Sequence, residues 1–375
     1  MIIAEIGTAH GGSLKKAEDL ITAAAEAGCD AVKFQWVYAD EILHPETGKV
    51  QLPGGPVKLY DRFKSLEVEP AFFSHMKNFA HKKNVLFMCS PFGLKSLSEL
   101  IKIEPDAIKI ASPELNHFQL LSALNEARHS CLHNGCKPVP VILSSGISKL
   151  ADIERALEIL YMPESEPTLL HCITSYPAPE EEYNVRLVKT LAKIFGIKTG
   201  ISDHSMDPVL VPSLAVSQGS TITEKHITLC RKTDGLDDPV ALEPEQFALM
   251  THDIHQAEAM LRHYGTELGA EKIIQQISAQ YGEEKVQKVL GTGIKKLAPS
   301  EKQNYGRTNR SLHFLHTMKK GETLKTGDIA VLRTEKILTP GIGPEYLEFV
   351  IGARLQNNVK NGSGVQWTDI ICRDR

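Results

Sequence analysis

Two histidines and one carboxylate occupy the ends of two short apolar runs in the second half of the chain. His204 ends the run "GISDH", His226 ends the run "TITEKH", and Glu224 precedes His226 by two residues. Side chains alternate between the two faces of a strand, so Glu224 and His226 share a face with Ile222. On neighbouring strands, which lie about 4.8 Å apart, two imidazoles can bind one metal ion at about 2.1 Å. Two protein ligands leave positions open for water and substrate, which indicates a catalytic cation; a hydrogen-bonded histidine pair is the alternative.

A second set of polar residues, also at the ends of apolar runs, suits an anion. It consists of Lys33, Ser90, Lys109, Ser112 and Ser144. Lysine supplies a point charge for phosphate or carboxylate, and hydroxyl groups supply hydrogen-bond donors. One polar strand end is ordinary because strand ends meet water, but eight polar ends with two lysines and two histidines indicate a functional site. There is no Walker loop, so we do not expect a nucleotide.

The elements that position these residues follow a repeated strand-helix rhythm. The apolar runs cover residues 1–7, 30–36, 84–90, 106–112, 139–145, 168–174, 197–202 and 219–226. A helix-period segment follows each run; in the first, Ser13 suits the N-cap and Gly28 the C-cap. Eight strand-helix units predict an α/β fold, a (β/α)₈ (TIM) barrel, with its chemistry at the carboxyl ends of the strands. A doubly wound sheet is the alternative, but no G-x-G-x-x-G follows the first strand.

The pattern changes beyond the eighth unit. We expect a catalytic barrel over 1–268, a linker with a helical insertion over 269–305, and a small β-rich domain over 306–375, where turn signals such as "KTGD" and "TPGIGP" separate short apolar pieces. The last 70 residues carry 11 Lys+Arg and 7 Asp+Glu, a charge of +4, and the rest of the chain carries -8. This asymmetry favours docking of the small domain onto the barrel.

Composition excludes several classes of protein. The 375 residues are 42% hydrophobic and 23% charged, with a net charge of -4, which gives no reason to expect nucleic acid as a partner. No apolar run reaches the length of about 18 residues that a membrane span needs. Seven scattered cysteines and an N-terminus without a signal-peptide layout favour free thiols and a cytoplasmic location. Cys131 and Cys136 flank His133, but no second ligand pair follows at zinc spacing, so we do not expect zinc there.

The strand-end motifs together resemble one known family. The segments "AEIGTAHGG", "DAVKFQ", "CSPF", "IKIASPE", "LSSGIS", "LLHCITSYPAP", "GISDHSMDP" and "EKHIT" occur in the order of the sialic acid synthase family, and "RTNRSLHFLHTMKKGETLKTGDIAVLR" resembles its antifreeze-like (SAF) domain. The resemblance implies a transferase that condenses phosphoenolpyruvate with an N-acylated hexosamine, such as N-acetylmannosamine, and releases phosphate. The product would be a nine-carbon 2-keto sugar acid.

The resemblance also implies roles for particular residues. Phosphoenolpyruvate would bind to Lys33, Ser90, Lys109, Ser112 and Ser144. His204 and His226 would bind a divalent cation, Mn²⁺ or Mg²⁺. The active-site carboxylates would be Glu5, Glu114 and Glu224, with Glu114 favoured to position or deprotonate the attacking water. The sugar contacts would be Gln35, Tyr176, Asp237 and Arg333. Arg333 would act across subunits, because in this family the SAF domain of one subunit caps the barrel of its partner; a domain-swapped homodimer follows.

Several residues depart from the family pattern. Ala9 replaces an asparagine, Ser90 a threonine and Gly93 a common aspartate, and Thr174 occupies the place of an asparagine in some members. The segment "DGLDDP" around Asp237 also lacks the usual proline and histidine. The last two changes affect the sugar side of the site, so the sugar stays open. The alternatives are a metal-dependent pyruvate aldolase and a sugar-binding barrel without catalysis; ice binding is not expected of a SAF domain fused to an intact barrel.

Overall fold

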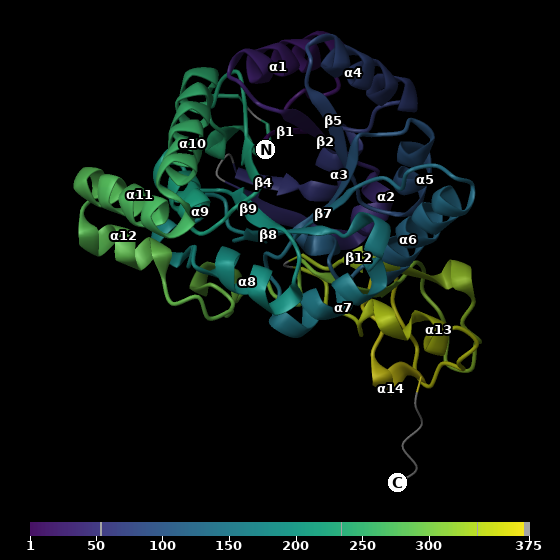
Figure 1. The fold of residues 1–375 in the computed structure, drawn as a ribbon. Coiled ribbons are helices and arrows are strands. Elements are labelled where there is room, and N and C mark those ends of the chain that lie inside the picture. The colour runs from purple at the N-terminus through teal and green to yellow at the C-terminus, as the bar shows by residue number, and fades with distance from the viewer. Residues whose placement is uncertain (53–54, 234, 336, 371–375) are drawn as a thin grey trace.

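Eight parallel strands close into a barrel in the computed structural model, which describes residues 1–52, 55–233, 235–335 and 337–370 (Figure 1). The strands are β1 (Ile2–Gly7), β2 (Ala31–Trp36), β5 (Leu86–Pro91), β6 (Ala107–Ile110), β7 (Val141–Ser144), β8 (Thr168–Cys172), β9 (Thr199–Asp203) and β10 (Thr223–His226). They follow one another around the barrel in chain order, and β1 pairs with both β2 and β10. The predicted (β/α)₈ barrel is confirmed.

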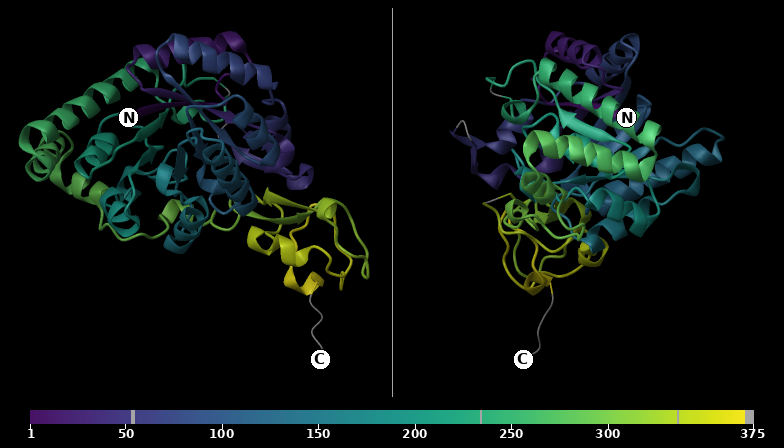
Figure 2. Two further views of the ribbon diagram at one scale, coloured as in Figure 1. Left: turned by 45° about the vertical axis from the view of Figure 1, so that its right-hand side comes forward. Right: turned by 60° about the vertical axis from the view of Figure 1, so that its left-hand side comes forward.

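Helices surround the barrel on its outer side (Figures 1 and 2). The helix that follows each strand is α1 (Leu14–Glu26), α4 (Pro70–Lys82), α5 (Leu94–Lys102), α6 (Phe118–His133), α7 (Leu150–Leu160), α8 (Leu187–Phe195), α9 (Leu210–Ser217) and α10 (Pro244–Tyr264). Ser13 caps α1 as expected: its side chain accepts a hydrogen bond from the Lys16 amide at 3.2 Å. Gly28 follows α1 with φ +86°, a conformation that favours glycine.

The inside of the barrel is layered because strand side chains alternate with a period of two. The innermost apolar layer is Ile3, Ala31, Met88, Ala107, Ile142, Leu170 and Ile222. Two residues further along each strand, the inward side chains are polar or charged, with one thiol among them. They are Glu5, Lys33, Ser90, Lys109, Ser144, Cys172, Ser202 and Glu224. The apolar layer therefore forms a dry floor beneath a polar one. Gly200 fits this floor without a side chain because a Cβ there would lie 2.3 Å from the Ile222 carbonyl oxygen.

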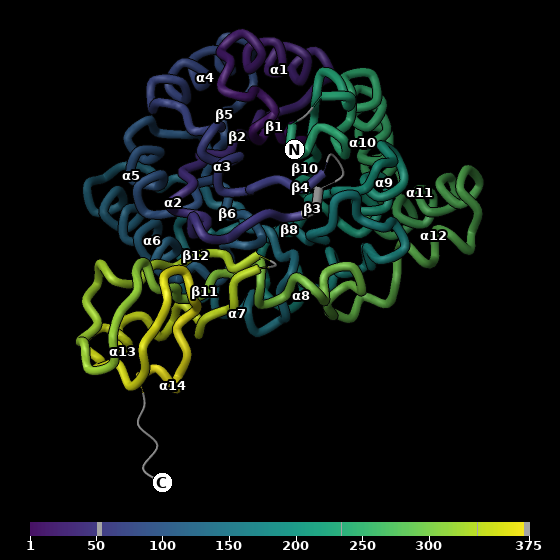
Figure 3. The backbone as a smooth tube through the Cα atoms, turned by 180° about the vertical axis from the view of Figure 1, so that it is seen from behind, coloured from purple at the N-terminus to yellow at the C-terminus, as the bar shows by residue number. Residues whose placement is uncertain are grey.

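The connection from β2 to α4 carries an excursion over the carboxyl end of the barrel. It contains α2 (Ala39–Ile42), η1 (Pro45–Thr47), the antiparallel strands β3 (Lys49–Leu52) and β4 (Gly55–Lys58), and α3 (Leu59–Lys64). Figure 3 shows the β3–β4 hairpin in front of the barrel strands. Short 3₁₀ turns follow three other strands: η2 (Ser112–Glu114) after β6, η4 (Glu180–Glu182) after β8 and η5 (Asp238–Val240) after β10. A further turn, η3 (Pro163–Ser165), lies between α7 and β8.

Two further helices and a small second domain complete the chain. Helix α11 (Thr266–Tyr281) packs against α9 and α10, and α12 (Glu283–Leu290) packs against α11. After η6 (Pro299–Glu301), β11 (Arg310–Phe314) and β12 (Ile329–Arg333) pair in an antiparallel sheet, followed by α13 (Leu347–Val350) and α14 (Trp367–Ile370), with 3₁₀ turns η7 (Thr326–Asp328) and η8 (Pro344–Tyr346). This domain has its own core and projects from the rim of the barrel (Figure 2). The helical insertion after the barrel is thus present, and the domain boundaries stay a prediction.

Two sequence-based expectations meet the structure here. Among the described cysteines, Cys29, Cys89, Cys172 and Cys230 are free, but Cys131 and Cys136 form a disulfide, so the expectation of scattered free thiols is wrong for that pair. Cys372 lies outside the described residues. None of the helices in the described ranges has the length and apolar character to cross a membrane.

A buried ion pair joins two strands on the outer face of the barrel. The side chain of Lys225 points to the opposite face of the strand from that of Glu224, because side chains alternate along a strand. Lys225 Nζ donates to Asp203 Oδ2 at 2.5 Å and to the Ser205 carbonyl at 2.7 Å. Lys225 and Asp203 are both 1% exposed. Neither charge has access to water, so each depends on the other.

Replacing Lys225 should therefore destabilise the barrel. We expect Lys225→Met to lower the free energy of unfolding by about 3–5 kcal/mol, because the Asp203 carboxylate stays buried without its cation. Urea denaturation measures this value. Lys15→Met is the matched control, since the Lys15–Asp19 pair on α1 is exposed and should cost less than about 1 kcal/mol. Equal losses in the two variants would contradict the argument.

Candidate active site

A small cavity opens at the carboxyl ends of the barrel strands and collects most of the predicted site residues. Its polar lining is Glu5, Lys33, Gln35, Ser90, Lys109, Ser112, Ser144, Tyr176, Ser202, His204, Glu224 and His226, together with Cys172. The volume is about 50 Å³. The predicted anion set, the histidine pair and two of the three predicted carboxylates therefore share one cavity. Three predicted residues do not line it: Glu114, Asp237 and Arg333.

Four charges pair with one another across the floor of this cavity. Lys33 Nζ lies 2.8 Å from Glu224 Oε2 and 3.3 Å from Glu5 Oε2, and Lys109 Nζ lies 2.9 Å from Glu224 Oε1. Ser202 also donates to Glu224 at 2.9 Å. All four charged residues are at most 4% exposed. Glu224 Oε1 thus accepts hydrogen bonds from Lys109 and Ser202, and Glu224 Oε2 forms an ion pair with Lys33.

The charge pairs set the protonation of these groups. Burial raises the pKa of the Glu5 carboxyl well above its usual range, and Lys33 only partly opposes this effect. Burial also acts against the charged form of Glu224, but Lys109 and Lys33 outweigh it and hold the Glu224 pKa far below normal. Burial lowers the pKa of Lys109. The attraction of Glu224 acts in the opposite direction, but Lys109 shares this carboxylate with Lys33. Glu224 is therefore a fixed anion, whereas Glu5 is the carboxyl group able to exchange a proton near neutral pH.

Two hydroxyl groups in the cavity are available as hydrogen-bond donors. Within the described part of the chain, the buried side-chain atoms without a hydrogen-bond partner include four in this cavity: the Oγ atoms of Ser90 and Ser144, and the Oε2 atoms of Glu5 and Glu224, which form ion pairs with Lys33. A buried polar group without a partner costs free energy, so such groups are rare unless a ligand completes them. Both hydroxyls line the cavity that contains Lys33 and Lys109. Two cations beside two hydroxyl donors are chemically suited to a small, multiply charged anion, although Glu5 and Glu224 already pair with these lysines.

His204 and His226 lie side by side above this floor. Their ring centroids are 5.6 Å apart, and Tyr176 stacks on His204 at 4.3 Å. The Nδ1 of His204 lies 2.8 Å from the Ile173 carbonyl, so in the neutral ring this nitrogen carries the proton and Nε2 has the lone pair that a metal ion needs. No group of three His, Cys, Asp or Glu within the described ranges is arranged to hold a metal.

The protonation of the two imidazoles differs. Burial lowers the pKa of His226 well below its usual range, which keeps the ring neutral and suited to a metal ion. Burial acts in the same direction on His204, but the negative charge of the Cys172 thiolate beside the ring outweighs it and raises the pKa of His204 to about 9. The Sγ of Cys172 lies 3.9 Å from His204 Nδ1. A cation at this pair would have to compete with that proton.

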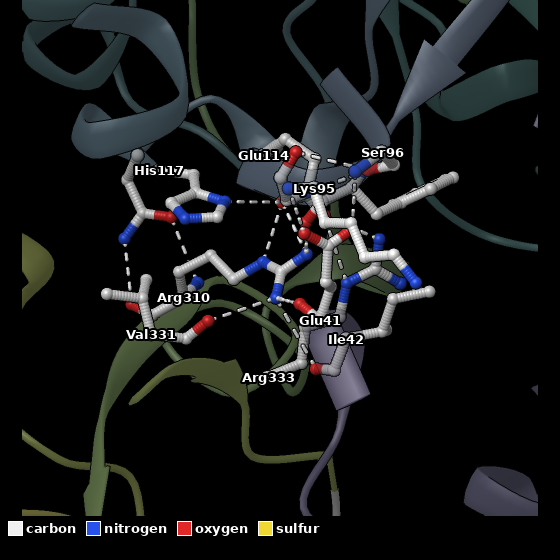
Figure 4. Close-up of polar contacts among 12 residues, drawn as sticks. Glu41, Ile42, Lys95, Ser96, Glu114, His117, Arg310, Val331 and Arg333 are labelled. Carbon is white, nitrogen blue, oxygen red and sulfur yellow. Dashed lines mark hydrogen bonds and ion pairs between the residues drawn. The ribbon is translucent and has the colours of Figure 1, made fainter. Parts of the chain in front are cut away.

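Glu114 lies outside the cavity in a separate buried cluster (Figure 4). Its Oε1 accepts from Arg333 Nη2 at 2.7 Å, and its Oε2 accepts from Arg310 Nε at 2.6 Å. His117 Nδ1 lies 3.3 Å from Oε2. Burial raises the Glu114 pKa, but the two guanidinium groups outweigh it and hold the pKa at about 2. Arg310 and Arg333 belong to the small domain, so this cluster joins the two domains through one carboxylate.

The remaining predicted sugar residues lie at or near the cavity mouth. Gln35 donates to Glu5 Oε1 at 2.9 Å, and Tyr176 is 47% exposed above the histidines. Asp237 is partly buried outside the lining; burial raises its pKa to about 6, against the opposing charge of His204. Arg333 contacts Glu114 of its own chain, whereas the resemblance implies a contact across subunits.

Sequence reasoning assigned no site role to Cys172 or Arg310, and it noted Ser202 only as a polar residue at a strand end. Cys172 and Ser202 line the cavity, and the period-two rule identifies both once the strands are known, because each lies two residues beyond a floor position. Arg310 has no such signal. Its partner is 196 residues away in another domain, and only the docking of the two domains brings them together.

A larger cavity of about 490 Å³ lies elsewhere, at the start of β6 and β7, which is the opposite end of the barrel. Its lining is largely aliphatic and proline side chains, and Arg128, its buried cation, already donates to three backbone carbonyls. The reactive groups converge on the small cavity instead. A (β/α)₈ barrel with convergent carboxylates, lysines and histidines at its carboxyl end defines a barrel enzyme.

Comparison with known proteins identifies the family of this enzyme. The NeuB family model matches residues 20–265, and the SAF domain model matches residues 309–371. The chain belongs to the NeuB family.

Individual relatives span nearly the whole chain. The spore coat polysaccharide biosynthesis protein SpsE of Bacillus subtilis is 30% identical over 100% of this chain and 94% of its own, and its crystal structure superimposes with a TM-score of 0.81, covering 100% of this chain and 96% of that one. The N,N'-diacetyllegionaminic acid synthase of Legionella pneumophila is 29% identical over 98% of this chain and 94% of its own. An N-acetylneuraminic acid synthetase from Leptospira borgpetersenii is 29% identical, with a TM-score of 0.60 over 81% of this chain and 89% of that one.

The low pKa of Glu114 predicts that the contact between the domains is sensitive to acid. Because the pKa of folded Glu114 is about 2 and the ordinary value is 4.5, the unfolded chain binds the proton more readily, and stability falls as pH drops from about 4.5 to 2. The difference of roughly 2.5 units corresponds to about 3 kcal/mol. Urea denaturation at pH 5 and pH 3 should show a smaller pH effect in Glu114→Gln than in the unmodified protein; an identical effect would contradict the assignment.

Proposed function

We propose that the protein condenses phosphoenolpyruvate with an N-acylated amino sugar, such as N-acetylmannosamine, to a nine-carbon 2-keto sugar acid and releases phosphate. The observation that carries this proposal is the pair of unpartnered hydroxyls, Ser90 and Ser144, beside Lys33 and Lys109 in one buried cavity. Phosphoenolpyruvate carries a phosphate and a carboxylate on a three-carbon unit, which suits two cations and two donors at close range. Relatives named as sugar-acid synthases support the same class of reaction.

His204 and His226 are the residues that would hold a divalent cation, Mn²⁺ or Mg²⁺. The donor set fits: two imidazoles leave open positions, and the hydrogen bond to Ile173 directs the His204 lone pair to Nε2. A cation bound there would polarise the aldehyde oxygen of the open-chain sugar as a Lewis acid. Tyr176, stacked on His204, would lie beside that sugar.

The chain's own residues would orient the reactants and move protons. Lys33, Lys109 and the serine hydroxyls would bind the phosphate and carboxylate and place carbon 3 of phosphoenolpyruvate against the aldehyde carbon. A carbon–carbon bond then forms, water adds to carbon 2, and the carbon–oxygen bond to phosphate breaks. Glu224 would keep both lysines charged, because its pKa remains far below neutral.

We assign the water-activating proton transfer to Glu5 in place of Glu114. Glu5 lines the cavity and its pKa is raised by burial, which suits a group that takes up and gives back a proton near neutral pH. Both oxygens of Glu114 accept from arginines, so the base role predicted for Glu114 has no support in this arrangement. Glu114 would instead anchor Arg333, the predicted sugar contact.

The test is phosphate release. Purified protein with phosphoenolpyruvate and Mn²⁺ should release inorganic phosphate only when an acceptor sugar is present, in a screen over N-acetylmannosamine, its 6-phosphate and diamino sugars. A pyruvate aldolase would form its product from pyruvate without any phosphate release, and a binding protein would do neither. No phosphate release with any of these sugars would count against the proposal.

Lys109 should matter for phosphoenolpyruvate more than for the cation. Lys109→Met removes one partner of a desolvated charge pair, which costs roughly 2–5 kcal/mol, so kcat/KM for phosphoenolpyruvate should fall about 30-fold or more. The apparent affinity for Mn²⁺ should change much less. Steady-state kinetics with each substrate varied measures both, with Lys15→Met as the control. Unchanged kinetics for phosphoenolpyruvate would refute the assignment.

His226 should matter for the cation. His226→Ala removes one of only two protein ligands, so we expect at least a tenfold loss of Mn²⁺ affinity, measured by calorimetry or by the paramagnetic signal of bound Mn²⁺. Chelation should abolish turnover of the unmodified enzyme. His75→Ala is the control, because His75 is exposed on α4 and pairs with Glu18. Full activity in excess chelator would exclude a catalytic cation.

The exchanged homodimer remains a proposal from the resemblance, and a mixing experiment tests it. Arg333→Ala and His226→Ala variants should each be inactive, and mixed dimers with exchanged domains would contain one barrel with intact His226 capped by an intact Arg333. Some activity should then return. If subunits exchange and no activity returns, the contact of Arg333 with Glu114 of its own chain is the one that operates.

A further inference from the structure

Arg310 makes more contacts with the barrel than its position on the small domain predicts. Its side chain is completely buried, at the first residue of β11. Besides Glu114, it donates through Nη2 to the Phe92 carbonyl at 2.7 Å and through Nη1 to the Glu41 carbonyl at 2.5 Å (Figure 4). These three partners follow β5, β2 and β6. One guanidinium group therefore ties three loops at the carboxyl end of the barrel to the small domain.

The side-chain carboxylate of Glu41 explains why glycine is found at position 93. Gly93 is the N-cap position of α5, where the resemblance implies an aspartate, and glycine has no side chain to accept from the helix amides. The Glu41 carboxylate supplies this cap: it accepts from the Lys95 amide at 2.6 Å and from the Ser96 amide at 3.1 Å. A Cβ at position 93 would lie 2.4 Å from that carboxylate. Glu41 thus occupies both the space and the function of a side chain at 93.

The contacts of Arg310 and Glu41 lie next to two residues of the proposed anion site, Ser90 and Ser112. Ser90, one of the two unpartnered hydroxyls, is two residues before Phe92, whose carbonyl Arg310 holds. Ser112 is two residues before Glu114, whose carboxylate Arg310 also holds. The turn between β5 and α5 is fixed at Phe92 by Arg310 and at the first turn of the helix by Glu41. The backbone of Glu41 is itself held by Arg310.

We propose that Arg310 is a positioning residue for phosphoenolpyruvate: through Phe92, Glu41 and Glu114, it holds Ser90 and Ser112 in the geometry that binds the anion. The small domain then has a second function besides covering the sugar, because its docking completes the phosphoenolpyruvate end of the site. This inference rests on the proposed function for the identity of the anion. Arginine is required because its planar fork reaches a carboxylate and two carbonyls at once, which a lysine ammonium group cannot do.

The first experiment compares three variants by direct binding and by kinetics. Arg310→Met should weaken phosphoenolpyruvate binding at least tenfold by calorimetry, and Arg310→Lys should remain weak because it lacks the fork. Arg155→Met is the matched control: Arg155 also forms a charge pair between the domains, with Glu345 at 3.3 Å, but it is exposed on α7 and does not line the cavity. The affinity of Arg155→Met for phosphoenolpyruvate should stay within twofold of that of the unmodified protein. Equal losses in Arg155→Met and Arg310→Met, or an unchanged affinity in Arg310→Met, would overturn the proposal.

The second experiment tests the path through Glu41 and does not depend on Arg310 variants that fail to fold. Glu41→Ala should raise KM for phosphoenolpyruvate about tenfold, with KM for the sugar within twofold. Adding Gly93→Asp should restore most of the affinity, because the space is then open and an aspartate can cap α5 directly. A merely structural role for Glu41 would change kcat and both KM values together. If the double variant keeps the raised KM for phosphoenolpyruvate of Glu41→Ala, the proposed role of Glu41 in positioning the anion site is contradicted.

A third measurement separates this inference from the proposed function. Hydrogen exchange at the amides of 94–97 should increase in Arg310→Met and in Glu41→Ala but not in Arg155→Met, whatever the ligand. If the unmodified protein does not bind phosphoenolpyruvate, the proposed function fails, and the exchange rates still decide whether Arg310 holds this turn. Unchanged exchange in Arg310→Met would overturn the positioning role itself.

Discussion

The pairing of Glu224 with Lys33 and Lys109 is the interaction on which the site depends. Both lysine ammonium groups lie within 3 Å of the Glu224 carboxylate above an apolar floor, where an isolated charge would be displaced or neutralised. Glu224 keeps its charge only because two lysines face it, and the lysines remain in the cavity only because Glu224 faces them. Such a cluster stabilises the fold weakly, since desolvation offsets most of the attraction. Under the proposed function, its value is that it presents two cations to the anionic substrate in a dry, preorganised cavity.

The same logic holds at the boundary between the domains. Glu114 is buried with Arg310 and Arg333, and its charge compensates two guanidinium groups that would otherwise repel each other. Because both arginines come from the small domain, the domain cannot leave the barrel without exposing or uncoupling this cluster. The contact therefore links the position of the small domain to the loops after β2, β5 and β6, which surround the cavity.

Gly93, at a position where the family commonly has aspartate, shows how a residue distant in the sequence compensates for the loss of a helix cap. Viewed along the sequence, Gly93 is a lost helix cap next to the cavity. In the structure, Glu41 accepts from the two amides that the cap would have served. Ser90 is a milder change, because serine keeps the hydroxyl of threonine, and its oxygen lies in the cavity as the anion site requires. Nothing in the structure explains Ala9, which is buried in the core beside the barrel.

The sequence by itself determined the barrel and most of the cavity. Strand side chains alternate strictly, so once the eight apolar runs are located, the residues two and four positions beyond the floor must face the same interior. That rule places Glu5, Lys33, Lys109, Glu224 and both histidines together, and it also contains Cys172 and Ser202. Only the tertiary structure decided that Glu114 turns away from the cavity to two arginines, that Arg310 joins three loops, and that Glu41 caps α5. These contacts join residues separated by 54 to 269 positions. No local period relates such residues, because their distance is set by how the domains and loops pack.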